Sequence, residues 1–340
     1  MNFLTNIFGG VFTSSGKSQH FFVEIQVLIV VLRKMGHYKV FSHFNMPKHA
    51  STLSFIAGES SSYRDKMKEN RLLKETEAHI REILGEELED ITVERAVFGL
   101  FFSGVKLSNG QGGLCFTPVK ELPQAVCCPS SAKAMPLSGR LVGRSVTKYL
   151  ADLDNLNILR KTLAIATLNA LSSSCWDKME SLPYKIIAER DAFDEITIPS
   201  PGKTVVIGAL VPMLKKLLAV DADFTVLEMD SRTLKGRELD HYAPTSDTLK
   251  YVPQADLLVI TGVTILNGSL EEILEVAKPD AQILVTGPTA SMLPDAFFKR
   301  GVTMLGGIRV THGDDVLDLI TEAGSGYHFF GKSAERIVIM

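Results

Sequence analysis

Residues that could hold a ligand or move a proton follow apolar runs in the second half of the chain. Leu257–Thr261 is apolar without alternation, which is typical of a strand buried on both faces of a parallel sheet. The residues at and beyond its end are small or polar: Thr261, Gly262, Thr264, Asn267 and Ser269. Ser269 and Glu272 have capping-box spacing, which predicts a helix N-terminus that favours anions or polar atoms. The sequence therefore predicts a ligand-binding loop between this strand and the next helix.

Two acidic residues follow another predicted strand, residues 224–227. Glu228 comes 20 residues after Gly208, the separation at which dinucleotide-binding folds place a ribose-binding carboxylate. Glu228 and Asp230 are the candidate catalytic residues, either binding a hydroxyl group or acting as acid and base, which requires a pKa raised by burial. The turn at Gly208 has one glycine where the dinucleotide fingerprint needs three, so a nicotinamide site is not expected. A methyltransferase-like use of this geometry, with Glu228 on a ribose, stays open.

Glycine follows four of the five strands that we predict in this half of the chain. In open α/β sheets, ligands bind beyond the carboxyl ends of the strands, and glycine lets the backbone approach a ligand closely. The candidates at this edge are Gly208, Gly262 and Gly287, the last followed by Pro288. The alternative is that these glycines only allow tight turns from strand to helix. Their recurrence at one edge favours ligand binding.

Composition and charge argue against several classes of partner. The net charge of −3, without a local stripe of Lys and Arg, argues against nucleic acid. Residues 21–32 are apolar but too short and too interrupted for a membrane span, which takes about 20 apolar residues. The four cysteines lack the spacing of a disulfide scaffold, so a cytoplasmic location is expected. We predict no metal site, because Cys127 and Cys128 are adjacent and residues 312–315 are better explained as a loop and a helix cap.

The first part of the chain divides into an extension and a small domain. Residues 1–65 are predicted to be a poorly defined N-terminal extension, with Met67 as a candidate functional start. Residues 66–182 predict an α+β domain. Its expected elements are a helix over 66–84, a strand over 91–107, a hairpin turn with a return at 113–116, and helices over 142–150 and 155–171.

The second part begins with a linker. Residues 183–203 carry three prolines and are predicted to join the domains. Residues 204–340 then alternate between strands and helices, which predicts an α/β, doubly wound parallel sheet of the Rossmann-like kind. The expected strands are 204–207, 224–227, 257–261, 282–286 and 302–305, and the expected helices are 211–220, 269–278, 294–300 and 315–322.

Several of these residues, taken together, resemble the heavy-metal chelation domain family. In the second half they are Val205-Val206-Ile207-Gly208, Glu228-Met229-Asp230, Thr261-Gly262 through Asn267, Gly287-Pro288 and Gly306-Gly307. In the first half they are residues 99–105, residues 112–118 and the helix over 155–171. The resemblance implies a Rossmann-like C-terminal domain preceded by a smaller α+β domain like the N-terminal domain of enolase. It also implies a site between the domains for a metal-chelator-related compound, such as a pterin-, flavin- or siderophore-like molecule.

From these observations we expect a cytoplasmic enzyme that acts on such a small molecule, with no nucleic acid or membrane partner. Thr117 and Asn169 are the expected contributions of the first domain to the site. The sequence names no cofactor, and association into a homo-oligomer is compatible with it. Two alternatives stay open: a non-catalytic binder or carrier of a metal–chelate complex, and an S-adenosylmethionine-dependent methyltransferase-like enzyme.

Overall fold

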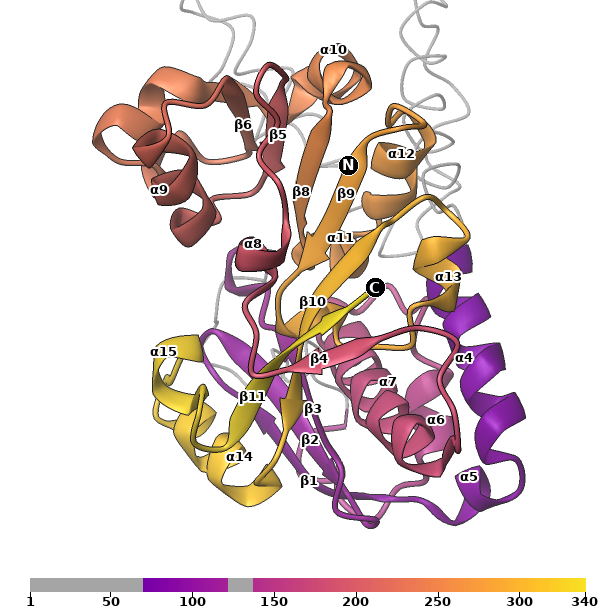
Figure 1. Cartoon of the computed structure of the whole chain (residues 1–340). Helices are drawn as coiled ribbons and strands as arrows, with labels where there is room; N and C mark the ends of the chain where they lie inside the picture. Colours follow the sequence, from indigo (N-terminus) through magenta and orange to yellow (C-terminus); the bar gives the residue numbers. More distant parts are fainter. Residues whose placement is uncertain (1–69, 122–136) are drawn as a thin grey trace, which may run out of the picture. The chain divides into compact units, whose positions relative to one another are not determined.

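The computed structural model of the chain describes residues 70–121 and 137–340 (Figure 1). The predicted extension over residues 1–65, the candidate start at Met67, and the adjacent Cys127 and Cys128 lie outside the described residues. The described residues all belong to one compact unit of the chain.

A mostly parallel sheet organises the second half of the chain. Within the described residues it has eight strands in the order β4-β11-β10-β9-β8-β5-β6-β7. These strands are β4 (Ile186–Ala188), β5 (Thr204–Ile207), β6 (Phe224–Glu228), β7 (Tyr242–Pro244), β8 (Leu257–Thr261), β9 (Gln282–Thr286), β10 (Met304–Val310) and β11 (Ala334–Ile339). From β7 to β10 all neighbouring strands are parallel. Their order across the sheet is that of the Rossmann fold. The prediction of an α/β, Rossmann-like doubly wound sheet is confirmed.

Three strands of this sheet were not predicted, and one of them lies in the expected linker. The short strand β4 pairs antiparallel with β11, which itself pairs antiparallel with β10. Residues 183–203 are therefore not only a linker, since Ile186 and Ile187 extend the sheet at its edge and α8 (Ala192–Glu195) follows. The third, β7, is a three-residue edge strand beside β6.

Helices cover both faces of the sheet, as a doubly wound fold requires. They are α9 (Val211–Ala219), α10 (Thr248–Tyr251), α11 (Val263–Asn267), α12 (Leu270–Glu275), α13 (Asp295–Phe298), α14 (Gly313–Thr321) and α15 (Gly326–Phe329). Successive strand residues point to opposite faces. Val206 accordingly packs in one hydrophobic cluster with Met213 of α9, whereas Val205 and Ile207 pack in the other.

The first half forms a three-stranded antiparallel sheet with helices beside it. Its elements are α4 (Arg71–Leu84), α5 (Glu87–Asp90), β1 (Val93–Phe98), β2 (Phe102–Leu107), β3 (Gly112–Phe116), a 3-10 turn at Val119–Glu121, α6 (Val146–Leu150) and α7 (Ile158–Lys178). The single strand predicted over residues 91–107 is wrong. The chain turns at Gly99, whose N–H donates to the carbonyl of Phe102 at 3.0 Å, and β1 then pairs with β2.

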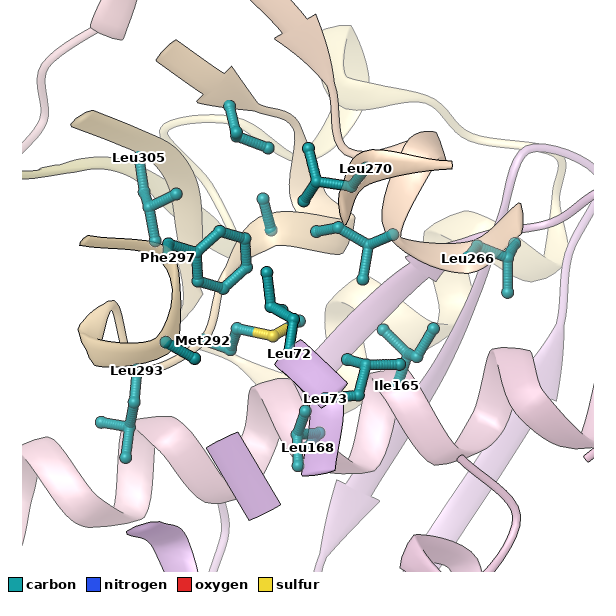
Figure 2. Packing of buried hydrophobic residues seen from close by; sticks show 14 of the residues in the cluster. Leu72, Leu73, Ile165, Leu168, Leu266, Leu270, Met292, Leu293, Phe297 and Leu305 are labelled. Atoms are coloured by element: carbon teal, nitrogen blue, oxygen red, sulfur yellow. The ribbon is translucent and has the colours of Figure 1, made fainter. Parts of the chain in front are cut away.

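Helix α7 ties the two halves together. It packs on β2 and β3, while α14 of the second half packs on β1 and β2 from the other side (Figure 1). Figure 2 shows Ile165 and Leu168 of α7 beside Leu72 and Leu73 of α4, with Phe297 of the second half in the same cluster. The boundary expected between the two domains is therefore crossed by one continuous hydrophobic core.

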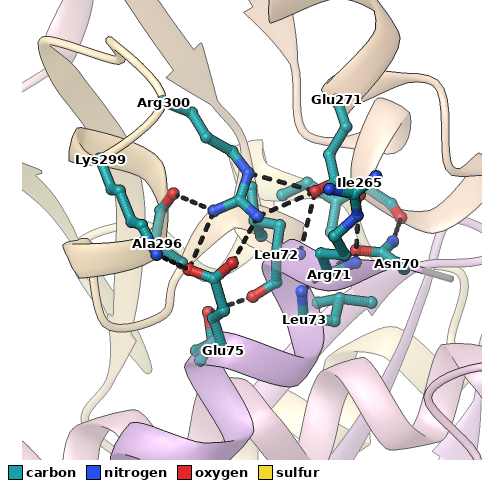
Figure 3. A network of polar contacts seen from close by, with 11 residues as sticks. Asn70, Arg71, Leu72, Leu73, Glu75, Ile265, Glu271, Ala296, Lys299 and Arg300 are labelled. Carbon is teal, nitrogen blue, oxygen red and sulfur yellow. Dashed lines mark hydrogen bonds and ion pairs between the residues drawn. The ribbon is translucent and has the colours of Figure 1, made fainter.

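A partly buried network of ion pairs also links α4 to the second half (Figure 3). The Arg300 guanidinium lies 2.8 Å from Glu75 and 3.0 Å from Glu271. The Glu271 carboxylate also accepts hydrogen bonds from the backbone N–H groups of Arg71 and Leu72. These groups belong to the first turn of α4 and have no acceptor within the helix. A side chain from the second half thus caps the helix that opens the described part of the chain.

Replacing Glu75 by glutamine should remove part of the acid sensitivity of folding. Hydrogen bonds from Arg300, followed by those from Lys299, lower the pKa of Glu75 from 4.5 to about 2. Because the folded pKa is the lower one, its stabilisation is complete above about pH 4.5 and is lost as the pH falls towards 2. Glu75 is a third exposed, so we expect the loss at pH 7 to be only about 1 kcal/mol.

Urea unfolding of the wild type and of Glu75→Gln at pH 7 and at pH 3 checks this expectation. The difference between the two proteins should shrink as the pH is lowered. Glu82→Gln, which changes an exposed glutamate of the same helix, is the matched control and should follow the wild type at both values. An equal difference between Glu75→Gln and the wild type at both pH values would contradict the assignment.

Candidate functional site

The carboxyl ends of β5 and β8 mark the point where the strand order reverses, which is where ligands bind in open α/β sheets. Here the two ends are in contact. Gly208 follows β5 with φ +91°, and a Cβ built on it would lie 2.8 Å from the Cγ2 of Thr261. The requirement for glycine is therefore explained by the turn and by the close approach of Thr261. At this position the structure therefore supports the alternative explanation, in which the glycine allows a tight turn from strand to helix.

The spacing between Gly208 and Glu228 does bring the carboxylate to the first turn. One carboxylate oxygen of Glu228 accepts the N–H of Ala209 at 2.9 Å. The other accepts the N–H groups of Met229 at 2.8 Å and Asp230 at 3.1 Å. The side chain that would hold a ribose thus fixes three backbone donors of the two loops.

Asp230 is held as an anion by two cations. Its carboxylate lies 2.7 Å from the Nζ of Lys120 and makes two hydrogen bonds with Arg232, at 2.8 and 2.9 Å. Arg232, and after it Lys120, hold the pKa of Asp230 well below its usual range. An acid–base catalyst would need the opposite shift. What Asp230 does is join the first half, through Lys120, to the end of β6.

The loop expected after β8 is a helix, so that part of the prediction is wrong. Helix α11 begins at Val263, directly after Gly262, whose N–H donates to the carbonyl of Thr286 at 2.7 Å. Thr264 is buried and donates its hydroxyl to the carbonyl of Thr261 at 2.7 Å. The helix packs against α7, and the Nδ2 of Asn70 donates to the carbonyl of Ile265. Protein atoms of the first half therefore occupy the space beside α11.

The capping box expected at Ser269 is also absent. Helix α12 begins at Leu270, and no side chain of Ser269 caps it. The Ser269 hydroxyl instead donates to the Oδ1 of Asn267 at 2.7 Å, and its backbone N–H donates to the same atom at 3.0 Å. Asn267 is exposed at the end of α11. These two residues stabilise the turn between two short helices.

The residues expected from the first half are buried between elements. The Nδ2 of Asn169 donates to three carbonyls: Leu114 at 2.8 Å, Pro288 at 3.1 Å and Thr289 at 3.2 Å. Asn169 thereby joins β3 to the turn that follows β9. Thr117 is 3% exposed and shares a hydrogen bond of 2.8 Å with the hydroxyl of Ser103. Asn169 thus contacts the second half through its Nδ2, while its Oδ1 is buried without a hydrogen-bond partner among the described residues, and the hydrogen bond of Thr117 stays within the first half.

The turn after β9 also lines a cavity of about 240 Å³. Of the predicted site residues it brings together Gly287 and Pro288, with the neighbouring Gly306-Gly307 pair of β10. The rest of its lining comes from residues 190–193 at the start of α8, Leu210 and Pro212, Thr286 and Ile308 of β9 and β10, Gly326, Tyr327 and Phe330 around α15, and Arg336 and Ile337 of β11. All of these residues follow position 189, so the cavity belongs to the second half and not to the boundary between the halves.

The charges in the cavity come from two arginines and one aspartate. The Arg336 guanidinium stands 4.0 Å above the centroid of the Phe330 ring, and its Nε lies 3.5 Å from a carboxylate oxygen of Asp191. The other oxygen of Asp191 accepts the N–H of Phe193 at 3.0 Å, as the N-cap of α8. Arg190 adds a second cation to the lining. The cavity therefore combines cationic donors with aromatic rings.

The backbone before α8 is held in an uncommon conformation. Glu189 has φ +57°, the left-handed region that residues other than glycine rarely adopt. Its N–H donates to the carbonyl of Arg336 at 2.8 Å, which fixes β4 to β11 at this point. The turn directs the next two residues, Arg190 and Asp191, into the cavity lining. A strained position beside a cavity is a common feature of binding sites.

Among residues 70–121 and 137–340, no three His, Cys, Asp or Glu side chains come together as they would to hold a metal ion. In the same part of the chain, no helix has both the length and the apolar surface needed to cross a bilayer.

Two family models match the chain, one in each half. Both are described as "Putative heavy-metal chelation", and they cover residues 81–172 and 191–339. An uncharacterised protein of Methanocaldococcus jannaschii is 24% identical over 270 residues, which are 77% of this chain and 95% of that protein.

Two crystal structures of proteins of unknown function have the same fold. One, from Pyrococcus horikoshii, has a TM-score of 0.61 and 22% identity, and covers 79% of this chain and 100% of its own. The other, from Desulfitobacterium hafniense, has a TM-score of 0.58 and 18% identity, and covers 80% of this chain and 98% of its own. Both carry the name of the family whose model matches residues 191–339.

Proposed function

The chain belongs to the heavy-metal chelation family, and from this premise we propose that it binds a small metal-chelating compound, or the metal complex of one. The proposed site is the cavity bounded by α8, α15 and strands β9 to β11. The observation that carries the proposal is the lining itself, in which arginine and aromatic side chains surround the turn after β9.

The size of the cavity supports a compact ligand. A cavity of about 150 Å³ accommodates benzene, and sites for drug-sized ligands begin at about 300 Å³. At about 240 Å³ this cavity matches one or two rings and is small for a dinucleotide or S-adenosylmethionine. The engagement of Glu228 with three backbone N–H groups also disfavours the methyltransferase-like alternative, which needs that carboxylate for a ribose.

The chemistry of the lining favours a binder or carrier over an enzyme. None of the described side chains that line the cavity is a histidine, cysteine, lysine or serine. The side chains of the lining that could carry a proton are Asp191 and Tyr327, and Asp191 is engaged with the N–H of Phe193 and with Arg336. The expected catalytic residues, Glu228 and Asp230, lie outside the lining and are bonded to other groups of the protein.

Isothermal titration of the full chain with a panel of small chelators tests the proposal. The panel contains 2,3-dihydroxybenzoate, its amide, their ferric complexes and a pterin, with S-adenosylmethionine as a comparison. We expect binding of at least one chelator, weakened roughly tenfold or more by Ala192→Leu, which places bulk over Gly306 in the lining. Ala219→Leu adds the same bulk at an exposed position of α9 and should bind as the wild type does.

Three further results separate the possible outcomes. Tyr327→Ala, at an exposed position of the lining, gives a second test if Ala192→Leu folds poorly. Weakening by Glu228→Gln but not by these two variants would move the site to the strand ends and refute the proposal. Recovery of the unchanged ligand supports a carrier, and a methylated or hydrolysed product would show an enzyme.

A further inference from the structure

We propose, on the basis of that binding function, that the cavity selects aromatic carboxylates, with Arg336 as the residue that binds the acid group and Asp191 as its internal counter-ion. The ligand class is a one- or two-ring compound that carries a carboxylate beside its metal-chelating oxygens. Three observations lead to this class. Within the described part of the chain, Arg336 has donors without a partner, only one carboxylate oxygen of Asp191 faces Arg336, and the aromatic side chains of Tyr327 and Phe330 line the cavity.

Arg336 has donors to spare and a restrained position. Among the described residues its side chain makes one ion pair, with Asp191 at 3.5 Å, and no hydrogen bond. A guanidinium offers five N–H donors in a planar fork that matches a carboxylate. The guanidinium lies 4.0 Å from the centroid of the Phe330 ring, and this contact restrains the side chain before an anion binds.

Asp191 can lose its ion pair with Arg336 and still cap α8. One of its oxygens caps α8 through the N–H of Phe193, while only the other faces Arg336. An incoming carboxylate therefore competes with a single oxygen at a distance longer than a hydrogen bond. Arg190 also lines the cavity, but its Nε lies 3.8 Å from a carboxylate oxygen of Glu195, so Arg336 is the cation that an incoming anion would meet.

The aromatic side of the cavity suits a ring. Tyr327 is 83% exposed, although it lies on α15 next to the buried Phe329 and within the lining. Phe330 also lines the cavity, with its ring under Arg336. A ring placed against Tyr327 would hold its acid group near Arg336, which combines apolar burial with a charge-assisted hydrogen bond.

A matched pair of ligands tests the selectivity. 2,3-Dihydroxybenzoate and 2,3-dihydroxybenzamide have the same ring and the same chelating hydroxyls, and differ in the charge of one group. We expect the wild type to prefer the acid by roughly tenfold or more, and Arg336→Gln to bring the two affinities close together. Arg336→Lys keeps the charge without the fork and should give an intermediate preference.

Asp191→Asn supplies a change in the opposite direction. Asparagine caps helices as well as aspartate does, so α8 should keep its start, while the internal counter-ion is removed. The acid should then bind several-fold more tightly and the amide as before. Arg237→Gln, at an exposed arginine that pairs with Asp221 outside the cavity lining, is the control and should leave both affinities unchanged.

The outcomes distinguish this inference from the proposed function. Equal affinities of the wild type for acid and amide, with Ala192→Leu still weakening both, would overturn the selectivity and leave the binding function standing. A preference for the acid that survives both Arg336→Gln and Arg336→Lys would also overturn it. If no chelator of the panel binds, both proposals fall together.

Discussion

Replacing Asn169 by leucine should lower the free energy of unfolding by about 3 kcal/mol, because it removes the amide donor of the buried Leu114 and Thr289 carbonyls, whereas the Pro288 carbonyl keeps the Ser291 hydroxyl at 2.9 Å. The Nδ2 of Asn169 donates to the carbonyls of Leu114, Pro288 and Thr289, and the residue is 2% exposed. Leucine has a similar volume but no donor, and water cannot easily replace the amide there. Because these carbonyls belong to different halves, the loss should also loosen the turn after β9.

Chemical denaturation monitored by circular dichroism measures this loss as a lower midpoint at an unchanged slope. Asn169→Asp should be at least as damaging, since a carboxylate would face three carbonyl oxygens instead of donating to them. Asn267→Ala is the matched control, because Asn267 is exposed and its contacts are confined to Ser269. If Asn169→Leu stays as stable as Asn267→Ala, the three hydrogen bonds do not join the halves in solution.

The sequence predicted the centre of the fold better than its edges. The central strands β5, β8 and β9 have the predicted bounds, because each is an apolar run that can be buried only between two layers of helices. The strand β11, one place in from the edge, escaped prediction because Glu335 and Arg336 interrupt its apolar run. The split between β1 and β2 also escaped, since Gly99 lies in a stretch otherwise typical of one long strand.

The candidate site shows the same limit in a different way. The spacing between Gly208 and Glu228 correctly indicated that the two would lie close together, yet it could not show that backbone N–H groups already occupy the carboxylate. The cavity depends on Arg336, Tyr327 and Asp191, which come from three segments without a common motif. Only the antiparallel pairing of β11 with both β10 and β4 brings these segments together.

Replacing Gly113 by alanine should destabilise the protein by about 3 kcal/mol or more, because the new methyl group would meet backbone and not flexible side chains. A Cβ at Gly113 would lie 2.1 Å from the carbonyl oxygen of Ala166 and 2.5 Å from the N of Ala170. Helix α7 would have to move away from β3, and the same helix carries Asn169. The glycine thus sets the distance between the helix and the sheet on which the link between the halves depends.

Gly104→Ala in the neighbouring strand provides the comparison. There the closest atoms to a new Cβ would be the Cδ2 atoms of Leu114 and Leu317, at 2.5 and 2.8 Å, which can move by changing rotamer. We therefore expect a smaller loss, about 1 to 2 kcal/mol, in the same denaturation experiment. Gly113→Ala should also weaken hydrogen-exchange protection in both α7 and the turn after β9, whereas Gly104→Ala should act mainly on α14. Equal losses from the two substitutions, with the same exchange pattern, would mean that α7 can shift freely on β3 and that its close approach does not hold the halves together.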